Sequence, residues 1–205
     1  MSKVIYTVGN MVKIPDVGSI ALHESVGNII FVGKMSYEPN IVAVNFFSTQ
    51  IFPLLKAKYS ELKFIIVGAN PDERVRKLAD IEGVTVTGFV DSIERYFRHS
   101  TIVVAPMLTG AGIQNKIIQA MSYGCCVATT TIGAEGLKIS NGEIEIFNST
   151  EEWISGMSRL IMNRKQRIDM GRLARQYVID NLSPQIISRQ FWRFIRNGGI
   201  DISSL

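Results

Sequence analysis

Short apolar runs recur along the first two thirds of the chain and constrain its fold more than any other feature. Most are rich in valine and isoleucine, do not alternate strictly with polar residues, and end at glycine, proline or threonine. Such runs are typical of parallel strands that are buried on both faces of a sheet. The predicted strands are 28–33, 63–68, 84–88, 101–106 and 126–129, and 143–147 is a candidate for a last strand.

Segments with helical periodicity lie between these runs, at residues 40–58, 72–80, 92–99 and 114–123. From Thr150 onward the chain is helical in pattern, with breaks at Asn163 and at Ser183-Pro184. Strands that alternate with helices through short connections favour an α/β fold with a doubly wound parallel sheet. We therefore predict a Rossmann-like sheet followed by C-terminal helices.

The chain of 205 residues is long enough to bury the core of one domain. We place this domain at residues 28–182. Residues 1–27 have poor periodicity and are interpreted as a hinge-like segment that leads into the domain. Residues 183–205 are interpreted as a C-terminal helix and tail.

The net charge of +4 suggests an anionic partner. One interpretation of the late basic residues is a solvated helix face, and the other is contact with an acidic membrane surface or a partner domain. No aromatic stacking pattern accompanies the charge, so we expect no nucleic-acid partner. Much of the excess comes from Arg159, Arg164, Lys165, Arg167, Arg172, Arg175, Arg189, Arg193 and Arg196.

The sequence predicts a cytoplasmic location. No apolar run reaches the roughly 18 residues that a membrane span needs. The N-terminus lacks the long apolar region of a signal peptide. Cys125 and Cys126 are adjacent, which is a poor arrangement for a disulfide and suits a reducing compartment. Any membrane contact is therefore expected to be peripheral, at the inner face.

A glycine-rich segment follows the predicted strand at 101–106. Gly110, Ala111 and Gly112 precede a predicted helix, and Lys116 falls in its first turn. Glycines before a helix allow close backbone approach, and unpaired N–H groups at the helix start bind phosphate oxygens. A cation is unfavourable at this end of the helix dipole, and a bound diphosphate would explain it. A tight strand-to-helix turn would use the same glycines.

The longer segment 110–137, GAGIQNKIIQAMSYGCCVATTTIGAEGL, closely resembles the donor-site segment of group 1 glycosyltransferases (family 4, GT-B fold). In that family a glycine loop is followed by a helix ending in E-A-M-x-x-G, a buried strand and G-x-E-G-[LI]. Segments 31–40 (FVGKMSYEPN), 63–71 (KFIIVGANP) and 84–97 (VTVTGFVDSIERYF) resemble other landmarks of the family in the same order. The resemblance covers roughly residues 28–184.

The resemblance implies one half of a GT-B enzyme, the C-terminal domain that binds a nucleotide-diphospho-sugar. An N-terminal acceptor-binding domain of about 170–200 residues, in the same or another chain, would close the cleft. Residues 184–197 resemble the helix that crosses back to that domain. Its contacts there would be Gln190, Phe191, Trp192 and Phe194, whereas an ordinary amphipathic helix would pack them on its own core.

The resemblance also assigns roles to individual residues. Lys34 stands where the family usually has an arginine facing the donor phosphates, and Lys116 stands where one subgroup places a basic residue. We expect these two lysines to be catalytic. Val90 is expected to meet the base through its backbone, beside Phe89, and Gln119 stands at the ribose-binding glutamate. The remaining expected donor contacts are Gly33, Gly110, Ala111, Gly112 and Ile113.

Two positions depart from the family's E-x7-E pattern. Ala111 replaces the first glutamate, which usually touches the sugar, and we interpret this as a subgroup trait. Gln119 replaces the second glutamate and can still bond ribose hydroxyls, but a loss of about 1 kcal/mol is expected without charge assistance. Glu38 and Glu135 lie in loops near the expected site, where each is either a sugar contact or a solvated carboxylate.

No metal or cofactor is expected besides the nucleotide-sugar donor. His23 and His99 are isolated from other ligand residues. The predicted function is retaining, metal-independent transfer of a sugar to a glycan or lipid-linked acceptor. The alternative is a non-catalytic nucleotide-sugar-binding module that needs a separate acceptor domain. An NAD-binding module is disfavoured because no G-x-G-x-x-G follows the first strand.

Overall fold

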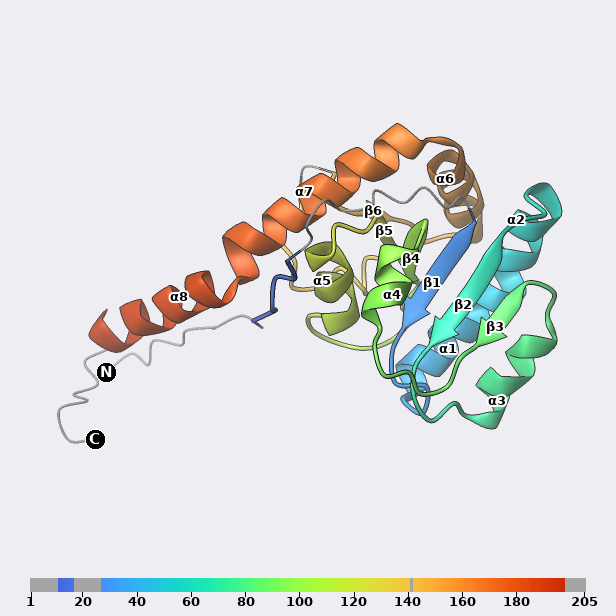
Figure 1. Cartoon of the computed structure of the whole chain (residues 1–205), viewed down its shortest axis with the longest axis horizontal. Helices are drawn as coiled ribbons and strands as arrows, with labels where there is room; N and C mark the ends of the chain where they lie inside the picture. Colours follow the sequence, from blue (N-terminus) through green and yellow to red (C-terminus); the bar gives the residue numbers. More distant parts are fainter. Residues whose placement is uncertain (1–10, 17–26, 141, 198–205) are drawn as a thin grey trace.

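A computed structural model describes residues 11–16, 27–140 and 142–197. Its centre is a six-stranded parallel sheet with the strand order β3-β2-β1-β4-β5-β6 (Figure 1). This order is that of a doubly wound Rossmann-like sheet, so the predicted fold class is confirmed. The strands are β1 (Asn28–Val32), β2 (Lys63–Val67), β3 (Val84–Val86), β4 (Ile102–Ala105), β5 (Val127–Thr129) and β6 (Glu145–Ile146).

The direction of strand addition reverses beside β1. The chain first builds outward through β2 to β3, and it then returns to place β4 on the other side of β1. Ile29 pairs with Phe64 of β2 on one side and with Ile102 of β4 on the other. In an open α/β sheet, the carboxyl ends of strands at such a switch point form a crevice where ligands bind. The loops after β1 and β4 therefore have the position of a site.

Helices cover the sheet on both faces. In Figure 1, α1 and α2 lie behind the strands, whereas α4 and α5 lie in front of them. The first helical stretch begins two residues earlier than the predicted 40–58, because Pro39 is accommodated in a first turn, where no N–H bond is lost. The helical segments between strands are α1 (Glu38–Phe46), the π-helical η1 (Phe47–Ile51), α2 (Phe52–Lys58), α3 (Glu73–Arg76), the 3₁₀ turn η2 (Lys77–Asp80), α4 (Glu94–Arg98) and α5 (Asn115–Ser122).

Three further helices follow β6: α6 (Thr150–Met162), α7 (Arg164–Leu182) and α8 (Pro184–Asn197). Ser149 and Glu152 form a capping box at the start of α6. Asn163 separates α6 from α7, and its side chain accepts a hydrogen bond from the Gln166 amide. The predicted breaks at Asn163 and at Ser183-Pro184 are confirmed.

The core lies on both faces of the central strands. Ile29, Ile30 and Phe31 of β1 are fully buried, as expected for a strand covered on two sides. Trp153 of α6 packs edge-on against Phe47, with ring centroids 5.6 Å apart, and so fixes α6 beside the first helical stretch.

The described part of the N-terminal segment, residues 11–16, runs beside α7. The Val12 amide donates to the Leu182 carbonyl at 3.1 Å, and Arg175 of α7 donates to the Pro15 carbonyl at 2.9 Å. The rest of the predicted hinge-like segment, residues 1–10 and 17–26, lies outside the described residues, and so do residues 198–205 of the predicted tail.

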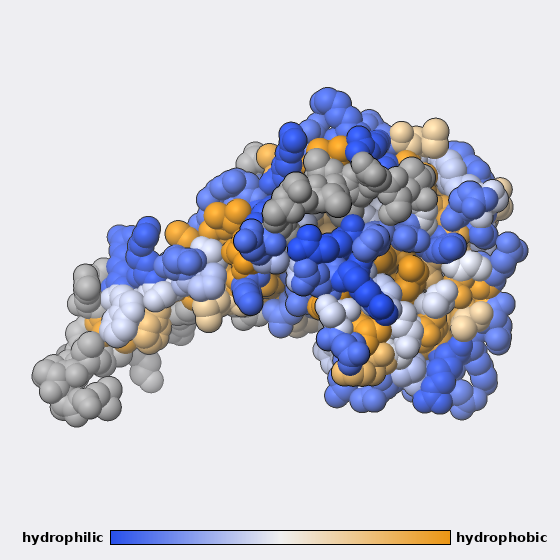
Figure 2. Space-filling view, in the orientation of Figure 1, coloured by the Kyte–Doolittle hydropathy of each residue, from blue (hydrophilic) through white to orange (hydrophobic). Residues whose placement is uncertain are grey.

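Helix α8 extends away from the body as an arm (Figure 1). Ile187 is buried near its start, but Phe191 and Trp192 are 43% and 48% exposed. Both hydrophilic and hydrophobic residues are open along this arm (Figure 2). The two aromatic residues therefore do not pack on the core of the domain, and the interpretation of α8 as an ordinary core-packed amphipathic helix is wrong for them.

Candidate functional site

The loops after β1 and β4 meet at the switch point of the sheet. Gly33 and Lys34 directly follow β1, and the segment 106–114 connects β4 to α5. A Cβ atom built on Gly110 would lie 3.9 Å from Cβ of Pro39, so the glycine loop adjoins the start of α1, which directly follows the loop after β1. The structure thus brings the predicted glycine loop next to the loop that carries Lys34.

The loop after β1 is hydrogen-bonded to the loop after β2. The Met35 amide donates to the Ala69 carbonyl at 3.0 Å, and the Met35 carbonyl accepts from the Asp72 amide at 3.0 Å. Asn40 donates to the Lys34 carbonyl at 3.0 Å. These bonds fix the backbone at Lys34, whose side chain is exposed.

Two glycines make this contact between loops possible. A Cβ on Gly68, whose φ is +155°, would lie 1.7 Å from the Gly33 carbonyl oxygen. A Cβ on Gly33 would lie 2.7 Å from Nδ2 of Asn40. Gly68 is therefore required for the close packing of the two loops, whereas a side chain at Gly33 would displace the Asn40 amide.

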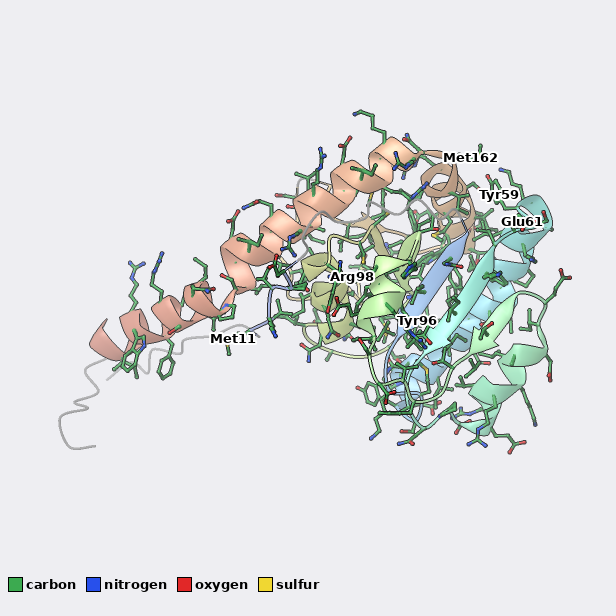
Figure 3. The ribbon with its side chains drawn as sticks, in the orientation of Figure 1. Met11, Tyr59, Glu61, Tyr96, Arg98 and Met162 are labelled. Carbon is green, nitrogen blue, oxygen red and sulfur yellow. The ribbon has the colours of Figure 1, made fainter. Side chains whose placement is uncertain are left out.

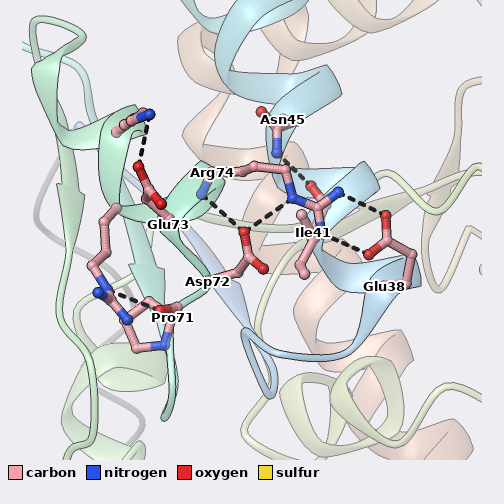
Figure 4. Close-up of polar contacts among 9 residues, drawn as sticks. Glu38, Ile41, Asn45, Pro71, Asp72, Glu73 and Arg74 are labelled. Carbon is pink, nitrogen blue, oxygen red and sulfur yellow. Dashed lines mark hydrogen bonds and ion pairs between the residues drawn. The ribbon is translucent and has the colours of Figure 1, made fainter.

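Glu38, considered above as a sugar contact, is bound in an ion pair in the structure. Arg74 donates to both of its carboxylate oxygens, at 2.9 and 2.7 Å, and also to Asp72 at 3.0 Å (Figure 4). The Arg74 hydrogen bonds hold the pKa of the Glu38 carboxyl below its usual range. The carboxylate of Glu38 thus joins α1 to α3.

The glycine loop has the backbone conformations that its glycines predict. Gly110 and Gly112 have φ values of +121° and +72°, which disfavour other residues. Ala111 is exposed, and Ile113 is half-buried. The Gly112 amide donates to Oε2 of Glu135 at 2.8 Å, so a carboxylate from the loop after β5 bonds to this loop.

Lys116 lies in the first turn of α5, as predicted. The helix has no acidic residue in this turn, and its N-cap residue Gln114 makes no capping bond. The Lys116 ammonium donates to Oε1 of Gln114 at 2.9 Å and lies 5.6 Å from the centre of the Phe31 ring. Burial lowers the pKa of Lys116 from 10.5 to about 8. Within the described ranges, no carboxylate forms a salt bridge with it.

Gln119 lies one turn further along α5 and borders two open depressions. The first has a volume of about 530 Å³ and is lined on its far side by Met11 and Lys13. The second, of about 470 Å³, extends toward Glu94 and Tyr123. The segment around Met11, labelled in Figure 3, therefore forms a wall opposite Gln119. No motif in the sequence indicated this wall, because it depends on contacts with α7 far along the chain.

Phe89 and Val90 lie in the loop after β3, on the β2 side of the switch point. Phe89 is 75% exposed, whereas Val90 is half-buried against the core. The loop is held at its start by a bond from the Thr87 amide to the Ile66 carbonyl of β2. These two residues are thus outside the pair of loops that carries Lys34 and the glycines.

The two cysteines lie in the core, away from the candidate site. Cys125 and Cys126 are free and fully buried, and burial raises the pKa of the Cys125 thiol to about 12. In the part of the chain that the structure covers, no three His, Cys, Asp or Glu residues are grouped to hold a metal ion. None of the helices described there is long and apolar enough to cross a membrane.

The chain is similar in sequence to known families and proteins. Residues 27–163 match the family model described as Glycosyl transferases group 1. An uncharacterized glycosyltransferase of Methanocaldococcus jannaschii is 32% identical over 128 residues, which are 58% of this chain and 33% of that protein. The chain spans at most 40% of the length of the curated relatives that it matches.

Solved structures share the fold. A TarM variant from S. aureus, crystallised with fondaparinux, α-GlcNAc-glycerol and UDP, superposes with a TM-score of 0.74 at 17% identity, over 94% of this chain and 39% of that one. The C-terminal domain of a group 1 family glycosyl transferase from Francisella tularensis gives a TM-score of 0.60 at 17% identity. That match covers 77% of this chain and 87% of the Francisella domain.

Proposed function

Because the chain belongs to the group 1 glycosyltransferases, we propose that it supplies the nucleotide-sugar donor site of a sugar-transferring enzyme. The donor lies across the carboxyl ends of β1 and β4, with its diphosphate at the glycine loop and the start of α5. The TarM structure contains UDP, and the Francisella match is to a C-terminal domain. Both support a nucleotide-binding C-terminal half.

The observation that carries this proposal is the position of Lys116. Its ammonium is partly buried at the positive end of the α5 dipole and lacks a carboxylate partner among the described residues. Both the burial and the dipole oppose its charge. A diphosphate bound at this point would offset both costs, which is why a cation is useful here only when an anion binds.

The role of the site in transfer is electrostatic. As the bond between sugar and diphosphate breaks, negative charge grows on the leaving diphosphate. Lys34, Lys116 and the amides of the glycine loop stabilise that charge, and they supply positive charge that a metal ion would otherwise provide. We therefore propose a metal-independent reaction that retains the configuration of the sugar, with a glycan or a lipid-linked acceptor.

The acceptor is held by a second domain, in the same or another chain. The relatives are at least twice as long as the matched region, which leaves room for such a domain. A non-catalytic nucleotide-sugar-binding subunit is the second candidate. It is favoured by Gln119, because a neutral amide binds ribose hydroxyls without the charge assistance of a glutamate.

Calorimetric titration with UDP, GDP and ADP, in the absence of metal, tests the donor site. We expect one nucleotide to bind selectively and Lys116→Ala to weaken its binding about tenfold or more, because a charge-assisted bond to phosphate is lost. The matched control is Lys77→Ala, which removes an exposed lysine that pairs with Glu73 on the protein surface.

The control variant is expected to bind as the wild type does. Absence of binding by folded wild-type protein to all three nucleotides would overturn the donor-site proposal. Equal losses in Lys116→Ala and Lys77→Ala would show that only the overall charge matters.

A further inference from the structure

Glu135 reaches from the loop after β5 to the glycine loop after β4. Its Oε2 atom accepts a hydrogen bond from the Gly112 amide at 2.8 Å, although the two residues are 23 positions apart. The Glu135 side chain is exposed, so packing does not force it into this position. The carboxylate thus accepts from a backbone N–H group in a glycine-rich loop of the kind that binds anions.

The loop that carries Glu135 is held in place by other contacts. The Thr130 hydroxyl donates to the Met107 carbonyl at 2.6 Å and accepts from the Gly133 amide at 3.0 Å, both in buried surroundings. Gly136 lies so close to Ile113 that a Cβ there would approach Cγ1 to 2.7 Å. The position of the loop therefore does not depend on the Glu135 carboxylate.

A carboxylate on this amide has a consequence for any anionic ligand. The Gly112 N–H points its positive end at Oε2, and a phosphate oxygen that used the same N–H would have to take that place. The negative charge of Glu135 would also repel a phosphate beside it. Removal of the carboxylate should thus favour an anion at the loop.

We propose that Glu135 is a built-in competitor of the donor diphosphate for the Gly112 amide. The inference rests on the proposed donor site and adds a regulatory element to it. In the empty protein the carboxylate holds the amide, and the incoming diphosphate displaces it. After transfer, return of the carboxylate to Gly112 assists release of the nucleoside diphosphate, a step that often limits turnover.

The competition predicts that loss of the carboxylate strengthens binding. We expect Glu135→Ala to bind inorganic pyrophosphate and the preferred nucleoside diphosphate about three- to tenfold more tightly than wild type. Glu135→Gln keeps an acceptor for the amide but removes the charge, so its affinity should lie between the two. If Glu135 instead contacted the ligand or only shaped the loop, its replacement would weaken diphosphate binding.

Glu61→Gln is the charge-matched control. Glu61 is exposed and lies where β2 begins, at the opposite end of the sheet from the site (Figure 3). The Glu61→Gln variant loses one negative charge, as Glu135→Gln does. Equal gains in diphosphate affinity in both variants would show a general charge effect and overturn the competition.

The amide resonance of Gly112 in ¹⁵N-labelled protein provides a readout without ligand. We expect it to shift in Glu135→Ala and to stay in place in Glu61→Gln; no shift in Glu135→Ala would overturn the contact itself. Binding that Glu135→Ala leaves unchanged or weakens would overturn the competition alone. No binding of any diphosphate by wild type or variants would overturn the donor site and the competition together.

Discussion

At Lys116, the stability of the fold is opposed to the proposed binding of a diphosphate. Its charged form is disfavoured by burial, so its pKa in the folded protein is about 8, below the ordinary 10.5. Between these two values the unfolded chain binds a proton that the folded protein does not. The free energy of unfolding therefore rises with pH through this window, and below about pH 8 the folded protein carries the full cost of burying the charged ammonium.

Replacement of Lys116 by methionine tests this opposition. We expect Lys116→Met to raise the free energy of unfolding at pH 7 by about 1–3 kcal/mol, because the cost of burying the charge disappears. At pH 10 the difference should shrink, since the wild-type lysine is then neutral when folded. Urea denaturation at the two pH values measures both quantities.

Lys116→Arg is the control for this prediction, because a guanidinium keeps its charge at both pH values. The difference in the free energy of unfolding between Lys116→Arg and Lys116→Met should therefore be the same at pH 7 and pH 10. A methionine variant that is less stable than wild type at pH 7 would contradict the argument and would indicate that the Gln114 and Phe31 contacts of the ammonium dominate.

At the scale of elements, the site depends on the contact between the loops after β1 and β2. Two backbone bonds join them, from Met35 N–H to the Ala69 carbonyl and from Asp72 N–H to the Met35 carbonyl, and a third runs from Gly33 N–H to the Val67 carbonyl at the end of β2. The register of β1 and β2 leads the two loops out side by side. The loop that carries Lys34 is therefore anchored to the end of the sheet by main-chain hydrogen bonds.

Gly68→Ala is expected to disturb this contact. The added methyl group would lie 1.7 Å from the Gly33 carbonyl oxygen, and backbone cannot move aside as a side chain does. We expect a loss of about 1–3 kcal/mol in the free energy of unfolding. Nucleotide affinity should fall as well, since Lys34 is displaced. Denaturation and calorimetric titration measure the two effects.

Gly142→Ala separates the clash from the strain of the backbone. Gly142 has a φ of +80°, but a Cβ there would lie 4.0 Å from its nearest neighbour in the described structure. We expect this variant to lose only about 1 kcal/mol and to bind nucleotide normally. If Gly68→Ala were no more harmful than Gly142→Ala, the contact between the loops would not be essential.

At the scale of the whole molecule, we propose that the described residues form one wall of a cleft. Lys34, Ala111 and Glu135 are exposed in the loops after β1, β4 and β5. Helix α8 extends away from the body, and its Phe191 and Trp192 are 43% and 48% exposed. The chain spans at most 40% of its relatives' length. The partner surface that would complete the cleft is therefore expected from a separate domain.

Transfer activity should depend on that domain. We expect the 205-residue chain to bind its nucleotide but to transfer sugar at least about a hundredfold more slowly than a fusion that adds the first half of a longer relative, because an acceptor must be held in place. Release of nucleoside diphosphate from a panel of nucleotide sugars measures both proteins. A fusion that binds donor and acceptor without turnover would favour the non-catalytic module instead.

The sequence by itself determined the fold and the position of the glycine loop. Apolar runs that alternate with helical segments leave few arrangements other than a parallel sheet, because each crossover must return the chain to the same end. Gly110, Gly112 and Lys116 are neighbours along the chain, so their arrangement follows from local rules. The breaks at Asn163 and Ser183 are local as well.

Only the tertiary structure decided which distant groups meet at this end of the sheet. The pairing of Glu38 with Arg74, the bond between Glu135 and Gly112, and the wall that residues 11–16 place opposite Gln119 all join separate parts of the chain. The degree of burial of Lys116 depends on such packing too. Periodicity and motifs describe neighbours within a few residues, whereas these contacts depend on how independently formed loops come together.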